Sequence, residues 1–276
     1  MTLITSLRSV LAAVLLSAIA LPVSPAFAQA TAKPFEPTVG QAGKDVVWVP
    51  TPQVLVEKML DLAKISPQDL HYDLGSGDGR TVITAAKRGA RSMGIEYNPD
   101  MVALAKKNAA DAGVTARATF VEADLFATDF SKANVVTLFL LPSINMKLRP
   151  QILDMPPGTR IVANTFTMED WAADQTETVS GDCVSWCTAL LWIVPAKVAG
   201  TWQVGSNALT LTQTFQKLEG TLGGAAITDA KMTGDDIAFT VGGGPRYAGT
   251  VKGNTITGTV TGGSGGSGTT FTATKK

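Results

Sequence analysis

A glycine-rich segment from Asp73 to Arg80 constrains the fold of this chain more than any other stretch. It follows a short apolar run and precedes a helical pattern over Thr81 to Arg88. Gly75, Gly77 and Gly79 alternate with other residues, so bare backbone can approach a ligand closely. The N–H groups at the start of the following helix would point at the same place with their partial positive charge. The segment therefore predicts a turn that binds a nucleotide or nucleoside.

Two further acidic residues lie at the ends of the next two predicted strands. Glu96 ends the predicted strand 91–96, 21 residues after the first glycine, where its carboxylate can accept both hydroxyls of a ribose. Asp124 follows the predicted strand 118–123, where it can face the exocyclic amine of an adenine. Each acid alone could instead cap the helix that follows it. Arg80 stands where a dinucleotide fingerprint needs a small residue, which argues against a dinucleotide ligand.

These motifs resemble those of a known family. DLGSGDGR (73–80), GIEYNP (94–99) and EADLF (122–126) resemble the first three motifs of class I S-adenosylmethionine-dependent methyltransferases. VPTP (49–52), FLLPSIN (139–145) and PGTRIVANTF (157–166) extend the resemblance to the small lysine methyltransferases, which include the mitochondrial ATP-synthase c-subunit methyltransferase. The resemblance covers about residues 46–195 and implies N-methylation of a protein lysine with S-adenosylmethionine as cofactor. The cofactor-binding residues that it implies are Val49, Pro50, Thr51, Asp73, Gly75, Ser76, Gly77, Gly79, Glu96, Asp124, Leu125 and Leu140.

The acceptor side is expected at the end of the fourth strand. Pro142 and Asn145 are the candidate catalytic residues there, although Pro142 could simply end the strand and Asn145 could cap a helix. The chain lacks the Asn-Pro-Pro-Tyr tetrad of amide-directed methyltransferases, which argues against adenine or glutamine nitrogen as the acceptor. His71 lies within a predicted strand and is interpreted as structural. Trp171 and Trp186 are interpreted as packing residues, with a cage around the substrate as the alternative.

Strand and helix patterns alternate over residues 46–198 and predict a Rossmann-like α/β methyltransferase domain with helices on both faces of its sheet. Residues 199–276 change in character, because seventeen of the 27 glycines lie between Gly200 and Gly268 among short alternating segments rich in Thr, Val and Ile. This pattern predicts a small antiparallel all-β unit, a meander or a barrel-like domain.

The N-terminus carries the features of a secretory signal peptide over residues 1–28. Arg8 precedes the apolar run Val10 to Leu21, and Ala26 to Ala28 offer a small-x-small cleavage site. Residues 29–45 are rich in Pro, Ala, Thr and Gly and are interpreted as a linker. We expect an exported protein, periplasmic or secreted; the alternative is an uncleaved segment that anchors the protein to a membrane.

Cysteine usage and charge limit the other function classes. Cys183 and Cys187 could form a disulfide in an oxidising compartment or could be two small buried apolar residues. Together with the single histidine they cannot supply a four-ligand zinc site, and no metal is expected. A net charge of zero and a pI of about 6.6 argue against a nucleic-acid partner.

Export conflicts with the expected cofactor, because S-adenosylmethionine is a cytosolic metabolite. An active methyltransferase that meets its cofactor in the exported compartment, or that acts from an N-terminal anchor, is the favoured interpretation, with a protein substrate. The alternative is a non-catalytic exported protein that binds a nucleoside or a protein partner and uses its β tail as the binding module.

Overall fold

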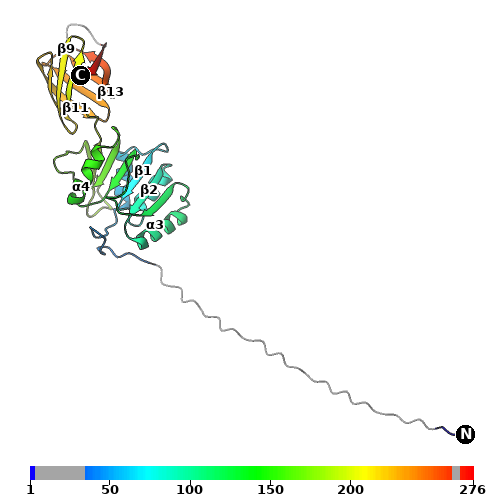
Figure 1. Ribbon diagram of the computed structural model, residues 1–276. Coiled ribbons are helices and arrows are strands. Elements are labelled where there is room, and N and C mark those ends of the chain that lie inside the picture. Colours follow the sequence, from blue (N-terminus) through cyan, green and yellow to red (C-terminus); the bar gives the residue numbers. More distant parts are fainter. Residues whose placement is uncertain (4–34, 263–267) are drawn as a thin grey trace. The chain divides into compact units, whose positions relative to one another are not determined.

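The computed structural model of the protein describes residues 1–3, 35–262 and 268–276, and Figure 1 shows it. The chain divides into the units Met1–Pro34 and Phe35–Lys276. Nearly all of the predicted signal peptide and the start of the predicted linker lie outside the described residues. No helix in the described part of the chain combines the length and the apolar character needed to cross a membrane.

A seven-stranded sheet forms the centre of the region that follows. Its order is β3-β2-β1-β4-β5-β7-β6, in which β1 to β5 are parallel and β7 is antiparallel to both β5 and β6. The strands are β1 (Leu70–Leu74), β2 (Arg91–Glu96), β3 (Ala118–Glu122), β4 (Val135–Leu138), β5 (Arg160–Asn164), β6 (Gln175–Thr178) and β7 (Thr188–Ile193). The strand order reverses between β1 and β4, and open α/β sheets bind their ligands at the carboxyl ends of the strands beside such a point.

Helices cover both faces of this sheet (Figure 1). They are α1 (Gln53–Leu62), α2 (Arg80–Lys87), α3 (Pro99–Asp111) and α4 (Pro142–Leu153). α1 packs on Val135 and Val162, whereas α4 packs with the neighbouring residues Val136 and Ile161. Since successive strand residues point to opposite faces, α1 and α4 lie on opposite sides of the sheet. α2 contacts α1 and α3 and shares their side. The predicted three-layer α/β architecture is confirmed.

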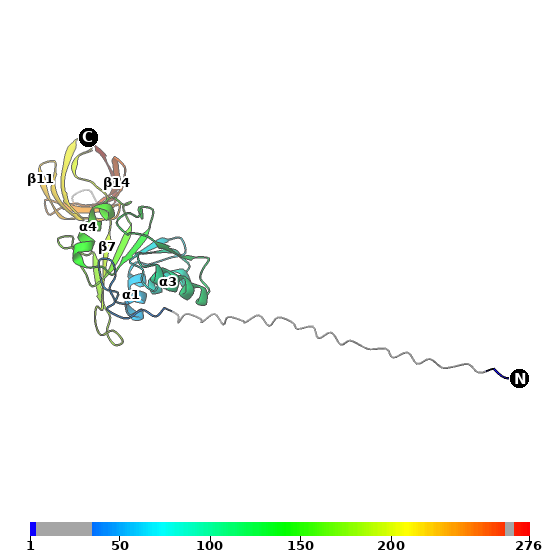
Figure 2. The same ribbon diagram turned by 60° about the horizontal axis from the view of Figure 1, so that its bottom comes forward.

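Residues from Gly200 onward form a closed antiparallel barrel (Figure 1 and Figure 2). Its strands are β8 (Gly200–Val204), β9 (Asn207–Thr214), β10 (Lys217–Leu222), β11 (Ala225–Thr233), β12 (Asp236–Val241), β13 (Arg246–Lys252), β14 (Thr255–Thr261) and β15 (Thr269–Lys275). Along β9 the buried Leu209 and Leu211 alternate with exposed threonines, as the sequence pattern predicts. β15 returns to pair with β8 and closes the barrel, and buried side chains such as Trp202 and Phe239 fill its interior. The predicted all-β unit is confirmed.

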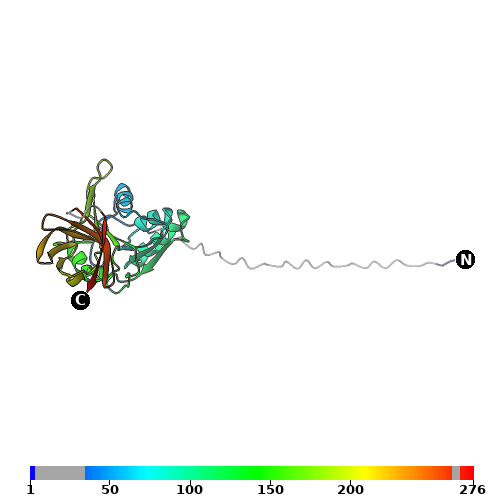
Figure 3. The same ribbon diagram turned by 90° about the horizontal axis from the view of Figure 1, so that it is seen from above.

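The loop between β6 and β7 projects beside α1, as Figure 2 and Figure 3 both show. Cys183 and Cys187 form a disulfide within this loop, with their Cα atoms 5.8 Å apart. The hairpin closes below it through Val179 N, which donates to the carbonyl of Cys187. The disulfide resolves the alternatives that the cysteine spacing left open.

Candidate functional site

A cavity of about 220 Å³ opens at the carboxyl ends of the parallel strands. Residues that end or follow β1 to β5 line it, together with the segment 41–51, named here the strap, and Trp186 from the β6–β7 loop. The predicted cofactor-binding residues converge on this cavity, and eleven of the twelve line it: Val49, Pro50, Thr51, Asp73, Gly75, Ser76, Gly77, Glu96, Asp124, Leu125 and Leu140. Gly79 instead packs behind the turn, where an added Cβ would lie 2.7 Å from the ring of Phe120.

The glycine turn and Glu96 are joined by a hydrogen bond to the backbone. Glu96 Oε2 accepts from Gly77 N at 2.9 Å, and its Oε1 accepts from Asn98 N at 3.0 Å. A carboxylate has about four lone-pair sites, so each oxygen can still accept a ligand hydroxyl. Gly77 has a φ of +51°, and a Cβ there would lie 2.6 Å from Trp48 Nε1. The turn therefore needs glycine for both its conformation and the close approach of the strap.

Asp73 belongs to a buried hydrogen-bond chain beneath the cavity. It is paired across the sheet with Thr137, whose Oγ1 donates to Asp73 Oδ1 at 2.6 Å. His71 Nε2 lies 2.8 Å from the same hydroxyl, and His71 Nδ1 lies 2.5 Å from Ser92 Oγ. Because the Thr137 proton is committed to Asp73, His71 donates from Nε2 and accepts at Nδ1. This arrangement places His71 in the structure behind the site, outside the cavity lining.

Asp73 and His71, both buried, have strongly shifted pKa values. Burial raises the pKa of Asp73 to about 7, despite the hydrogen bond from Thr137, and the charges of Asp78 and Glu96 raise it further. Burial lowers the pKa of His71 to about 3, so its ring is neutral at pH 7. A cationic ligand group beside Asp73 would favour the ionised carboxylate. The site is therefore suited to a ligand that carries positive charge.

The strap closes the cavity on the side of β2 and β3. Lys44 Nζ contacts Asp124 Oδ2 at 2.5 Å and lies 4.7 Å from the centroid of the Tyr97 ring. The hydrogen bond from Lys44 lowers the pKa of Asp124. Lys44 belongs to the stretch interpreted from the sequence as a linker, and Trp48 follows it. Neither was predicted as a site residue, since a lysine and a tryptophan in such a segment carry no motif.

The predicted catalytic residues lie at the start of α4, outside the cavity lining. Pro142 occupies the first turn of the helix, a position that favours proline. Asn145 is fully buried, and its Nδ2 donates to the carbonyls of Phe166 and Thr167 at 3.3 and 3.2 Å. Its contact with Phe166 links it to the cavity indirectly, because Phe166 does line the cavity. A catalytic role for either residue stays a prediction.

Aromatic and apolar residues form the β4–β5 end of the cavity. Phe139, Leu140 and Leu141 follow β4, Phe166 follows β5, and Trp186 reaches the cavity from the disulfide loop. Trp186 was interpreted as a packing residue, yet 43% of its surface is exposed. Its sequence neighbours gave no signal for the site, because the hairpin between β6 and β7 brings it there.

The chemistry of the lining fits S-adenosylmethionine, which combines a nucleoside, two positive charges and a carboxylate. Ser76 Oγ is buried and has no hydrogen-bond partner among the described residues. A Cβ at Gly75 would lie 3.2 Å from Leu140 Cδ2, so the turn leaves room that a side chain would fill. Glu96, at the end of β2, stays the predicted partner of the ribose. Asp124, after β3, stays the predicted partner of the adenine, and one of its carboxylate oxygens already contacts Lys44. These residues would hold the cofactor on the side of the cavity nearest β1 to β3.

Comparison with known proteins gives concordant matches. A family model described as the ANTKMT methyltransferase domain matches residues 73–175. A protein-lysine N-methyltransferase of Saccharolobus islandicus is 43% identical over 129 residues, which cover 46% of this chain and 80% of that relative. An adenine nucleotide translocase lysine N-methyltransferase of Mus musculus is 36% identical, over 42% of this chain and 51% of the relative. The chain thus spans about half the length of the mouse protein.

A solved structure supports the same fold and ligand. The RNA methyltransferase from Salinibacter ruber, in complex with S-adenosyl-L-homocysteine, is 47% identical and superposes with a TM-score of 0.51. The match covers 54% of this chain and 96% of that chain. S-adenosyl-L-homocysteine is what S-adenosylmethionine becomes when its methyl group is lost.

Proposed function

We propose that this chain, which belongs to the S-adenosylmethionine-dependent ANTKMT methyltransferase family, transfers a methyl group to the side-chain amino group of a protein lysine. S-adenosylmethionine is its cofactor. The lysine acceptor is the part of this statement that is proposed, since the names of the relatives include both lysine and RNA methyltransferases.

The charge of the cavity is the observation that carries a lysine acceptor. Among the described residues, five acidic side chains and two basic ones line it: Asp45, Asp73, Asp78, Glu96 and Asp124 against Lys44 and Arg80. Both basic side chains are already paired with acids of this set. An RNA acceptor would bring phosphates that need unpaired cations. A lysine acceptor carries no phosphate in its side chain and needs no such cation, so it fits this lining better than RNA does.

The residues of the chain have two tasks in the reaction. When bound, S-adenosylmethionine supplies a methyl group on a positively charged sulfur, which leaves with the electron pair of the broken C–S bond as a neutral thioether. The lysine nitrogen forms the new N–C bond with its lone pair and releases a proton to solvent. The turn, Glu96 and the strap hold one partner in place, and alignment of this kind can contribute about 7–11 kcal/mol.

The second task is to favour the neutral amine. A lysine with a pKa of about 10.4 is almost fully protonated at pH 7, and neutralising it costs about 4–5 kcal/mol. The apolar end formed by Phe139, Leu140 and Leu141 disfavours a charged ammonium, because burial lowers the pKa of an amine. No separate general base is required if the proton leaves before the amine is enclosed.

A labelling experiment tests the acceptor. The full-length enzyme is incubated with S-adenosylmethionine that carries a tritiated methyl group and with protein extract from the cells that express it. Parallel reactions contain either extract whose lysines have been blocked by acetylation or total RNA from the same cells. We expect label in untreated protein only. Label in RNA, or in protein with blocked lysines, would refute the lysine acceptor.

Variants of the cofactor side serve as controls in that experiment. Asp73→Ala and Glu96→Ala should each lose transfer and weaken the binding of S-adenosylhomocysteine in a calorimetric titration. A wild-type enzyme that gives no heat with millimolar cofactor would contradict the assignment of the cavity. The non-catalytic alternative gains no support from the relatives.

We propose in addition that residues 1–28 direct export of the enzyme. The apolar run and the Ala26 to Ala28 site support this proposal, and a disulfide is typical of oxidising compartments. Fractionation of cells that express the chain with its own N-terminus tests it. A full-length product confined to the cytosol would contradict export, and a full-length product in the membrane would favour the anchored alternative.

A further inference from the structure

Three aromatic rings make a continuous surface at the β4–β5 end of the cavity, named here the aromatic wall: Phe139, Phe166 and Trp186. The rings of Phe139 and Phe166 stack, with centroids 5.9 Å apart and planes 19° apart. Trp186 meets Phe139 edge-on, at 6.0 Å and 61°. The wall therefore joins the ends of β4 and β5 to the disulfide loop.

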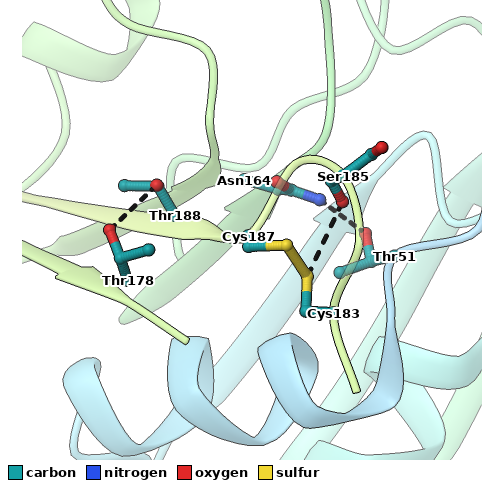
Figure 4. Close-up of a disulfide and its surroundings, with 7 residues drawn as sticks. All are labelled: Thr51, Asn164, Thr178, Cys183, Ser185, Cys187 and Thr188. Carbon is teal, nitrogen blue, oxygen red and sulfur yellow. Dashed lines mark hydrogen bonds between the residues drawn. A yellow bond between two sulfur atoms is a disulfide. The ribbon is translucent and has the colours of Figure 1, made fainter. Parts of the chain in front are cut away.

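The chain holds Trp186 in an uncommon conformation. Its φ is +54°, in the left-handed region that bulky residues rarely adopt. Such a conformation persists only where the surrounding structure fixes it, and it is concentrated at functional sites. The adjacent residue Cys187 is bonded to Cys183. Figure 4 shows this disulfide above α1, near the hydrogen bond between Asn164 and Thr51.

The other two residues of the wall follow strands of the central sheet. Phe139 lies between β4 and α4 in the chain, and Phe166 follows β5, where its backbone carbonyl accepts from Asn145 Nδ2 at 3.3 Å. The wall therefore combines two residues at the end of the sheet with one from the disulfide loop. Trp186 nevertheless stays partly exposed, so its ring is open to a ligand.

The wall lies across the cavity from the residues that are predicted to bind the nucleoside. Gly77, Glu96 and Asp124 lie just after β1, at the end of β2 and just after β3, where the nucleoside part of the cofactor is predicted to bind. In the sheet order β3-β2-β1-β4-β5, the wall lies on the other side of β1. A ligand group that touches the wall is therefore one that approaches from the side opposite the nucleoside.

We propose that Trp186, positioned by the Cys183–Cys187 disulfide, recognises the methyl acceptor and packs with Phe139 and Phe166 around the alkyl chain and amino group of the lysine. This inference rests on the proposed lysine acceptor. Aromatic faces attract the cationic amine as it approaches. Exclusion of water, once the rings enclose the amine, favours its neutral, nucleophilic form. Reduction of the disulfide would release Trp186, so acceptor recognition depends on the oxidation state of the loop.

Replacement of Trp186 tests this recognition. The full-length Trp186→Ala enzyme is assayed with tritiated S-adenosylmethionine over a range of concentrations of the protein extract that is labelled on lysine. We expect the half-saturating acceptor concentration to rise about tenfold, which corresponds to about 1.4 kcal/mol. Trp186→Phe should recover part of this loss. Calorimetric affinity for S-adenosylhomocysteine should stay within about twofold, which also shows that the variant is folded.

Val184 supplies the matched control. It lies in the same disulfide-closed ring, is 96% exposed, and does not line the cavity. Val184→Ala should leave both the acceptor dependence and the cofactor affinity unchanged. If Val184→Ala raised the half-saturating acceptor concentration as much as Trp186→Ala, a specific contact of Trp186 with the acceptor would be refuted. The change would then reflect a general effect of the loop.

Reduction of the Cys183–Cys187 disulfide tests its contribution to acceptor recognition. Treatment with a phosphine reductant should raise the half-saturating acceptor concentration of the wild type and should have no further effect on Trp186→Ala. Equal sensitivity of both proteins to the reductant, or an unchanged acceptor dependence in Trp186→Ala, would overturn the inference while lysine labelling still stands. Label that enters RNA instead would show that the proposed acceptor itself is wrong.

Discussion

Asp73 lowers the free energy of unfolding above about pH 4 and is expected to contribute to cofactor binding. Replacement by asparagine separates these two effects. The side chain is 6% exposed, and burial raises the pKa of its carboxyl from 3.8 to about 7. Between these two values the folded state binds the proton more tightly than the unfolded state. The free energy of unfolding therefore falls as the pH rises from about 4 to about 7, and it is constant with respect to this group at higher pH.

The size of this effect follows from the shift. About three pKa units at about 1.4 kcal/mol each give a penalty of about 4 kcal/mol at pH 8, of which about 3 kcal/mol develops between pH 5 and pH 8. In the Asp73→Asn variant the side-chain carbonyl would still accept from Thr137, but the new amide N–H groups need partners, at a cost of about 1–3 kcal/mol that does not depend on pH. The change in stability between the two pH values is therefore the informative quantity.

The assay compares Asp73→Asn with the wild type by denaturant or thermal unfolding at pH 5 and at pH 8. We expect the variant to gain about 3 kcal/mol relative to the wild type between the two pH values, equivalent to about 6–12 °C in Tm for a domain of this size. The same variant should bind S-adenosylmethionine at least tenfold more weakly, because a hydrogen bond to a charged group is worth about 1.5–3 kcal/mol.

Glu122→Gln is the matched control, since Glu122 is an exposed carboxylate at the end of β3. It should change stability by no more than about 0.5 kcal/mol at either pH. The reasoning is refuted if Asp73→Asn has the same effect on stability at pH 5 and pH 8, or if its relative stability falls as the pH rises.

Three further changes probe other contacts of the site and its support. Glu96→Gln leaves one of two backbone N–H groups facing an amide NH₂, so affinity for S-adenosylhomocysteine should fall at least tenfold in calorimetry, while unchanged affinity would contradict the observed hydrogen bonds. Gly77→Ala places a Cβ 2.6 Å from the tryptophan of the strap and should weaken the same affinity, whereas Gly113→Ala, also at positive φ but with open space around it, should lower Tm without loss of binding. Arg160→Met leaves the Asp69 carboxylate, 8% exposed, without its cationic partner, and it should cost about 3–5 kcal/mol in the free energy of unfolding. Lys107→Met, in an exposed pair, should cost about 0.5 kcal/mol; equal losses would show that burial is not the cause.

Local signals made the cofactor side of the cavity predictable from the sequence. The glycine turn, Glu96 and Asp124 each end or follow a predicted strand, and parallel strands bring their carboxyl ends to one edge of the sheet. The start of α3 also depends on a local contact, since Asn98 Oδ1 accepts from Asp100 N at 2.9 Å and caps the helix.

The acceptor side depends on contacts between distant parts of the chain. Trp186 reaches Phe139 only because the β6–β7 hairpin adds to the sheet beside β5, and Lys44 reaches Asp124 only because the strap folds back over the cavity. Neither segment has a periodic pattern or a motif that states its partner. Asn145 was predicted from its place after β4, but its side chain turns to the carbonyl of Phe166 and does not line the cavity.

The pairing of β15 with β8 has a consequence for synthesis of the chain. The barrel closes only when Ala273 can pair with Val204, which lies in its first strand. Proteins fold domain by domain as they emerge from the ribosome, with N-terminal domains first, and contacts between distant residues form slowly. The methyltransferase sheet can therefore assemble while the rest of the chain is still emerging, from the ribosome or on the far side of the membrane. The barrel remains an open meander until residues 269–275 have emerged as well.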